Sequence, residues 1–445
     1  MYKSILNARS NANELLPDGQ ENESLSLVTK VCLAVIFISA ALVGILPKAI
    51  IGIIILCACV PLINYRDIYL VYPVIIFYHL QLGQLFGVSV YSLFSLMFFL
   101  FSFLKEKDLR INTRFVAPFV LFVVYCFVVI GQYNIKTSFL AIFDTMSVMI
   151  LVTHYLSVPD KLKKFFRVFA LIALVAFFTG TRLNTGTDTG ILVNGEVVDL
   201  VRNCATFEDP NYMGFFYTVA IFSTVTLKLF DPRFRVVLII VLYAMLLSTL
   251  SVTAIVVNVL IWLLYLVIAK KITFKVFLLV VFIVGVLLGL YSYGKANPDM
   301  PIFGMLATRM TVKFEGVAYV GSENIGSLTS GRTDLARVHF DYFMELPIWR
   351  MFVGMNAASS LRTDLSGFRT AAHNEYVDWL LNVGIIGTLL MIWFILSRFM
   401  NVYRDYKESH DLASLFVIFS KLIWMFYAFT LTVYGDFRFL LFFLL

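Results

Sequence analysis

Charged side chains are scarce in this chain, and their scarcity decides its class. Asp, Glu, Lys and Arg make up 14% of the 445 residues, whereas hydrophobic residues make up 60% and phenylalanine occurs 44 times. An average soluble domain carries about 25% charged residues and fewer apolar ones. The composition therefore excludes an ordinary soluble protein and predicts a polytopic integral membrane protein.

Several motifs that hold nucleotides, metals or nucleophiles are also missing. The chain has no complete Walker phosphate loop, no H-E-x-x-H, no G-x-S-x-G and no clustered aspartate pair suited to a divalent metal. We therefore expect no cofactor and no metal site. Any phosphate chemistry would have to draw its positive charge from arginines.

The cysteines, the net charge and the first residues of the chain each bear on the class of protein. Of the five cysteines only Cys204 lies in a polar segment, so no disulfide framework is implied. The net charge of +7 comes from basic residues clustered in short linkers, which orient a membrane protein and give no sign of nucleic-acid binding. Residues 1–27 are polar and lack an apolar core with a cleavage site, so we expect a retained cytosolic tail.

Apolar stretches long enough to cross a bilayer recur along the chain. About 20 apolar residues at 1.5 Å per residue span the hydrocarbon layer, which predicts an all-α fold of about 12–14 transmembrane helices. The basic linkers all fall on one side if the N-terminus is cytosolic. The candidate spans are 28–46, 48–64, 68–84, 88–105, 115–133, 137–156, 164–181, 211–229, 233–249, 252–270, 274–294, 376–398 and 412–434.

This topology places two long polar segments outside the cytosol. The second of them is expected to contain an amphipathic helix around 332–345 that ends before Pro347. Long loops on one face are where function concentrates. The expected organisation is a cytosolic tail (1–27), N-terminal transmembrane helices (28–181), a first external loop (182–210), central transmembrane helices (211–294), a large external catalytic loop (295–375) and C-terminal transmembrane helices (376–445).

The run His373-Asn374-x9-Gly384-x-x-Gly387 lies where the large loop meets a predicted helix. Asn374 and His373 lie where the predicted helix begins, so simple N-capping is the structural interpretation. Asn374 and Tyr376 are also candidate substrate-binding residues beside His373. Eleven residues make three helical turns, which predicts that His373 and Gly384 share a face. The two glycines either let another helix pack closely or leave a groove for a lipid chain whose head group lies beside His373.

Arginines in the two external loops are candidates for binding phosphate. Ser330-Gly331-Arg332 opens the predicted loop helix, and His339 lies two turns later on the same side. A planar guanidinium can hold a phosphate through two donors, although Arg332 could also be an ordinary solvated charge. Arg350 is a weaker candidate of the same kind. His339 is a further candidate substrate-binding residue, whose structural alternative is an ordinary packed or solvated histidine.

In the first external loop, Arg202 precedes the turn Asp209-Pro210-Asn211, which leads into a predicted helix. Arg202 is either a surface charge or the second half of a diphosphate clamp. Asn211 is a further candidate substrate-binding residue.

These three segments, in their order and sidedness, resemble the O-antigen ligase and O-antigen polysaccharide polymerase family. The resemblance rests on the histidine–glycine run, on Ser330-Gly331-Arg332 and on Arg202 with Asp209-Pro210-Asn211, over roughly 180–400. Cys204 stands where a glycine is expected, and the first 180 residues resemble the family only in their apolar spans.

The resemblance implies a GT-C-like glycosyltransferase of the bacterial inner membrane with its active site on the extracytoplasmic face. Its partners would be a polyprenyl-diphosphate-linked glycan donor, a glycan acceptor and membrane lipid, with a chain-length regulator as a candidate protein partner and no nucleic acid. In such enzymes the arginines bind the diphosphate and the histidine activates the acceptor. Those roles fall here on Arg202, Arg332 and His373.

Two activities share all of these residues. A polymerase would join lipid-linked repeat units into O-antigen or capsular polysaccharide, whereas a ligase would move glycan onto a lipid-A core or similar acceptor. We favour the polymerase, because no feature dedicates the loop to one large amphipathic acceptor. A lipid-linked sugar flippase would instead have smaller loops and a polar cavity, and a non-catalytic assembly partner would tolerate alanine at His373.

Overall fold

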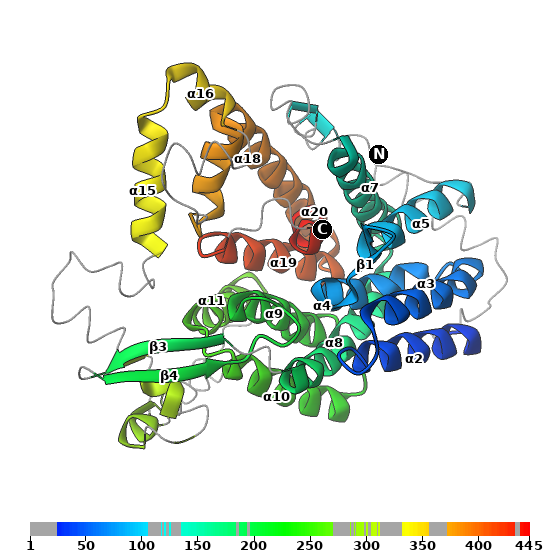
Figure 1. Ribbon diagram of the computed structural model, residues 1–445, viewed down its shortest axis with the longest axis horizontal. Coiled ribbons are helices and arrows are strands. Elements are labelled where there is room, and N and C mark those ends of the chain that lie inside the picture. Colours follow the sequence, from blue (N-terminus) through cyan, green and yellow to red (C-terminus); the bar gives the residue numbers. More distant parts are fainter. Residues whose placement is uncertain are drawn as a thin grey trace.

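A computed structural model describes most of the chain. The described residues are 25–105, 135–183, 187–193, 196–269, 332–355, 372–431 and 437–445, with isolated residues or short stretches between 117 and 125 and between 285 and 311. Figure 1 shows that these residues form a helical bundle, with the helices of the large loop at one edge. The mostly helical content agrees with the all-α prediction.

The helices fall into four groups along the chain. The N-terminal group is α2 (Leu27–Ala41), α3 (Lys48–Asn64), η1 (Ile68–Val71), α4 (Tyr72–Leu82), α5 (Val90–Lys105), α7 (Ile135–Ile150), η2 (Leu151–Tyr155) and α8 (Pro159–Leu183). The central group is α9 (Pro210–Thr226), α10 (Pro232–Ser248) and α11 (Val252–Ile268). The large loop forms α15 (Arg332–Met344) and α16 (Ile348–Val353), and the C-terminal group is α18 (Glu375–Ser409), α19 (Leu412–Ala428) and α20 (Phe437–Leu444).

Side-chain caps explain why the central helices begin where they do. Asp209 accepts from the backbone N–H of Asn211 at the start of α9, and Ser251 accepts from that of Ala254 at the start of α11. Pro210 occupies the first position of α9, where a missing N–H costs nothing. The predicted boundaries at 211 and 252 are therefore close to the observed ones.

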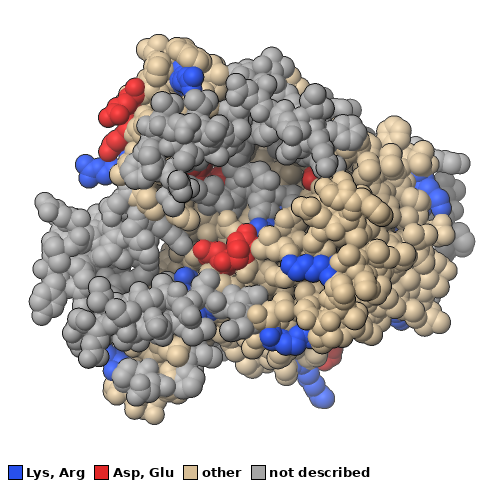
Figure 2. Space-filling model, viewed as in Figure 1, with Lys and Arg blue, Asp and Glu red and all other residues tan. Residues whose placement is uncertain are grey.

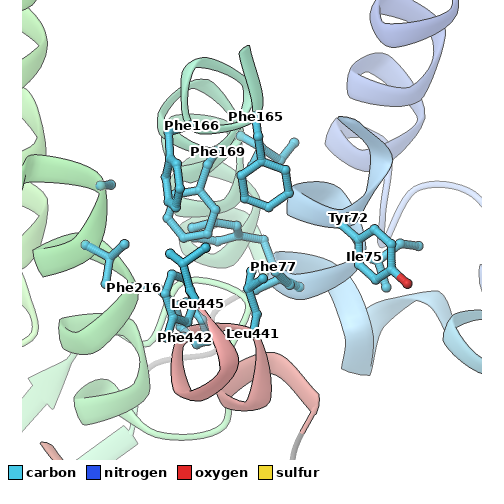
Figure 3. Packing of buried hydrophobic residues seen from close by; sticks show 14 of the residues in the cluster. Tyr72, Ile75, Phe77, Phe165, Phe166, Phe169, Phe216, Leu441, Phe442 and Leu445 are labelled. Atoms are coloured by element: carbon cyan, nitrogen blue, oxygen red, sulfur yellow. The ribbon is translucent and has the colours of Figure 1, made fainter. Parts of the chain in front are cut away.

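Aromatic rings pack together at the centre of the core. Figure 3 shows Phe165, Phe166 and Phe169 of α8 packed against residues of α4, α9 and α20. The ring of Phe169 lies 5.0 Å from that of Phe77 and 5.9 Å from that of Phe442. The short helix α20 is thus inserted at the centre of the bundle, a role that its length alone did not predict.

Many large apolar side chains face outward from the same helices. Ile38, Ile240 and Leu389 are examples on α2, α10 and α18, and each is well exposed. Among the described residues, α18 is the one helix that is long and apolar enough to cross a membrane by length and composition, and α2, α3, α5, α11, α19 and residues 68–82 are shorter apolar helices. The number of crossings stays a prediction.

Two short hairpins depart from the all-α expectation. Strands β1 (Gln84–Leu85) and β2 (Val88–Ser89) pair in one, and β3 (Thr187–Val193) and β4 (Glu196–Arg202) pair antiparallel in the other, with Thr187 opposite Arg202. The longer hairpin occupies the predicted first external loop. Its sequence signal is Asn194-Gly195 between two runs rich in β-branched residues, a strong local predictor of a hairpin.

The helix that follows the large loop is bent sharply. Gly384 has φ 65° and ψ −173° within α18, so the helix consists of a first limb before Gly384 and a second limb after it. Figure 1 shows that the two limbs meet beside α16 and run in different directions. The expectation that His373 and Gly384 share a helix face is therefore wrong. The helix also extends beyond the predicted span 376–398, because residues 399–409 continue the second limb.

Candidate functional site

The loop that ends in α9 holds a buried arginine. Arg202, the last residue of β4, is 7% exposed, and its Nε donates to the carbonyl of Thr249 at 3.1 Å. The next backbone N–H, from Asn203, donates to the carbonyl of Ser248 at 3.2 Å. The chain after β4 is thus tied to the end of α10, and Arg202 is not the surface charge that one interpretation expected.

Asn211 completes the start of α9 and is fully engaged in it. Its side-chain amide donates to Asp209 at 2.6 Å, and its oxygen accepts from the hydroxyl of Ser251 at 2.7 Å. Asn211 is buried between α9 and α11. These contacts show a positioning role for Asn211, while substrate binding by this residue stays a prediction.

The start of α18 sets the position of His373. Asn374 caps the helix, its side-chain oxygen accepting from the backbone N–H of Tyr376 at 3.1 Å and of Val377 at 3.3 Å. His373, just outside the cap, is half-buried and has φ 51°. Few residues other than glycine adopt this left-handed conformation, which here turns the chain as it enters the helix.

The last turn of α19 joins the starts of α18 and α9. The hydroxyl of Tyr376 donates to the carbonyl of Met425 at 3.1 Å, and its ring lies 4.7 Å from that of Phe429. On α9, the ring of Phe215 lies 5.3 Å from that of Tyr427. The His373 segment and the Arg202–Asn211 segment therefore lie at the same end of the bundle.

Helix α20 contributes a residue to this end that the sequence analysis missed. Arg438 is buried and forms a two-pronged ion pair with Glu208, at 2.7 Å from Nη2 to Oε1 and 3.3 Å from Nη1 to Oε2. The Arg438 guanidinium also lies 5.5 Å from the ring of Tyr212, and the ring of Phe439 lies 5.1 Å from the same ring. A single arginine in the apolar run 437–445 was the available signal.

Two buried acids beside His373 were also missed. Glu375 accepts from the indole N–H of Trp379 at 2.7 Å, and Asp378 accepts from the backbone N–H of Ala372 at 3.4 Å. Carboxylates in the first turn of a helix are stabilised by its dipole. Asp378 thereby holds the backbone directly before His373.

The candidates of the large loop are divided between α15 and α16. Arg332 opens α15 as predicted, but its side chain lies outside the described part of the structure. His339 is buried, and its Nδ1 lies 2.8 Å from the carbonyl of Leu335 one turn earlier. Arg350 is on α16, 4.9 Å from the ring of Trp349. Within the described residues no contact links Arg350 to the His373 segment.

The space at the two glycines is filled. A Cβ on Gly384 would come within 2.4 Å of the carbonyl oxygen of Phe352, and one on Gly387 would come within 2.5 Å of the Val383 side chain. Gly354 approaches Gly384 equally closely from its own side. The geometry supports the close-packing interpretation of these glycines. It contradicts a lipid groove directly at Gly384.

Residues 236–392 match a family model described as O-antigen ligase, about a third of the chain. Over this segment the chain is similar to the O-antigen ligase family. The matched segment begins within α10, contains α11, α15 and α16, and ends in the second limb of α18. It includes Arg332 and His373 but not Arg202. No curated protein sequence matches the chain.

The O-antigen ligase family has a general function. The family consists of glycosyltransferase-like enzymes of the bacterial inner membrane that act in polysaccharide and lipopolysaccharide biosynthesis. Its members take a lipid-linked glycan and an acceptor as substrates.

Proposed function

We propose that this protein is a metal-independent glycosyltransferase that polymerises polyprenyl-diphosphate-linked repeat units into O-antigen or capsular polysaccharide. The observation that carries the proposal is the common location of His373 and the buried Arg202 at one end of the bundle, with His373 inside the segment that matches the O-antigen ligase family. A titratable imidazole and a desolvated positive charge are the two groups that such a transfer requires.

The chemistry is a single displacement at the anomeric carbon of the donor. Neutral His373 accepts the proton of an acceptor hydroxyl while the oxygen forms a bond to that carbon. The bond from the carbon to the diphosphate breaks, and the polyprenyl diphosphate leaves with both electrons. Arg202 and Arg332 stabilise the charge that develops on it, and fixed cations in a poorly solvated site do this without reorganising water. One displacement inverts the anomeric configuration.

Membrane placement is part of the proposal. Many large apolar side chains of α2, α10 and α18 are exposed, and exposed apolar surface of this kind supports a position of these helices against lipid. Among the described residues on the face shown in Figure 2, charged side chains are few and scattered. We assign the end that carries Arg202 and His373 to the extracytoplasmic side, because the basic linkers lie at the opposite ends of the predicted spans.

A ligase is the second candidate, and the description of the matched family favours it. Both activities would use the same donor and the same residues. They differ in the acceptor, which is a second lipid-linked repeat unit for a polymerase and a lipid-A core or similar glycolipid for a ligase.

Purified protein given one synthetic polyprenyl-diphosphate-linked repeat unit in EDTA separates these activities. The polymerase predicts a ladder of product lengths on a gel. Transfer that begins only after a separate acceptor glycolipid is added would establish the ligase. Activity that requires an added divalent metal would overturn the metal-independent mechanism.

A further inference from the structure

A cluster of large apolar side chains is exposed on the helices of the large loop. Ile348 is 74% exposed, Trp349 58% and Phe352 48%, all on α16. Phe340 and Met344, one turn apart on α15, are exposed as well. We call these five residues the α16 patch.

The opposite side of the same helices is firmly packed. Phe343, Leu346 and Met355 form a small hydrophobic cluster with Leu381 of the first limb of α18. The backbone N–H of Met355 donates to the carbonyl of Leu381 at 2.8 Å, and Gly354 lies against Gly384 at the break of α18. The α16 patch is therefore the outer face of an anchored helix pair, not the surface of a frayed segment.

The composition of the α16 patch matches the interface of a membrane. Tryptophan is enriched where hydrocarbon meets head groups, because its ring is apolar and its N–H is polar. Arg350 lies 4.9 Å from the ring of Trp349, which places a cation beside the apolar face where it can reach lipid phosphate. An apolar face with a cation beside it is the kind of surface that interfacial helices present to the head-group layer.

The α16 patch also lies beside a surface with the same character. Helix α16 packs at the break of α18, where the apolar second limb begins (Figure 1). The second limb exposes Ile386, Leu389 and Trp393 directly after the break. The α16 patch thus lies next to the helix surface that we assign to lipid.

We propose that α16 is an interfacial anchor that rests in the head-group layer of the bilayer and fixes the height of the large loop above it. A second copy of the chain is a poorer occupant, because a stable protein interface takes about 20–30 residues from each side. The anchor holds α15, and with it Arg332 and His339, at the membrane surface where a lipid-linked diphosphate would lie. The inference shares the membrane placement of the proposed function but not its chemistry.

Depth-dependent quenching of tryptophan fluorescence tests the anchor. The full chain is reconstituted in bilayers whose phospholipids carry bromine either near the head group or deep in the acyl chain. The quenching of Trp349 is obtained by subtracting the signal of the Trp349→Phe variant from that of the wild type. The Trp393→Phe variant gives the quenching of Trp393 in the same way. Trp393 is a matched control, since it is also about half exposed. It lies nine residues after Gly384 on the second limb, on the order of 13 Å from the break at 1.5 Å per residue.

We expect the Trp349 component to be quenched more strongly by shallow bromine and the Trp393 component more strongly by deep bromine. Quenching of Trp393 but not of Trp349 by either lipid would overturn the anchor and leave the membrane placement intact. Strong quenching of Trp349 by deep bromine alone would overturn the interfacial position. If neither tryptophan were quenched, the membrane placement itself would fail, and the anchor with it.

Discussion

The two segments that carry the proposed chemistry are held in different ways. The Arg202–Asn211 segment is closed in on several sides, by Thr249 at the end of α10, by Ser251 of α11 and by Arg438 of α20. His373 itself is half-buried, on a backbone held by the Asn374 cap, by Asp378 and by the contact of Tyr376 with α19. A charge that stabilises a leaving group gains from a rigid, desolvated position. A base that must admit varied acceptor hydroxyls gains from access.

The largest effect is expected at the more open segment. His373→Ala removes the proposed base and should lower the rate of glycosidic bond formation by about 10²–10⁴-fold. The rate is measured by donor consumption with purified protein in detergent. His410→Ala is the matched control, because His410 has the same φ of 51° and lies at the other end of α18. Equal rates for the two variants would remove His373 from the chemistry.

A lysine at the closed segment should be damaging although the charge is kept. Arg202→Lys loses the donor to Thr249 and the planar fork that fits a diphosphate. We expect a loss of about 10²-fold, the size seen when one transition-state donor is removed. The exposed Arg337 provides a control as Arg337→Lys. A wild-type rate for Arg202→Lys in the same assay would contradict the proposal that Arg202 binds the diphosphate.

The ion pair of Arg438 tests whether the rigidity of the Arg202–Asn211 segment matters. Glu208→Gln keeps the size of the side chain but removes the charge partner of Arg438. Because the carboxylate is partly exposed, we expect a loss of only about 1 kcal/mol in the free energy of unfolding. If the folded Glu208→Gln protein transfers glycan more slowly than the wild type, the ion pair helps to position Arg202. Unchanged thermal unfolding and unchanged activity would show that the pair is dispensable.

The smallest effect is expected from the cap of α18. Asn374→Ala should cost about 1 kcal/mol, the usual value of an N-cap, and lower activity modestly by loosening the backbone at His373. Asn374→Asp restores a capping oxygen and should restore both stability and rate. A variant that regains stability but not activity would instead support contact of Asn374 with substrate.

Local patterns in the sequence predicted the local structure well. The cap and proline at Asp209-Pro210-Asn211 start α9, and Arg332 opens α15 as expected. The β3–β4 hairpin was missed although Asn194-Gly195 signals it.

Features that depend on distant partners could not be predicted in this way. The break at Gly384 requires the close approach of Gly354, thirty residues earlier in the chain. The burial of Arg438 depends on Glu208, more than two hundred residues away. The apolar periodicity therefore indicated a straight helix through Gly384. The short segment that forms α20 was too short to indicate a role.

The anomeric configuration of the new linkage tests the central claim most directly. NMR of the product from a donor of defined configuration would report whether the sugar was inverted. A single displacement of diphosphate by an acceptor hydroxyl, with His373 as base, predicts complete inversion. Retention would exclude a single in-line displacement and would contradict the mechanism.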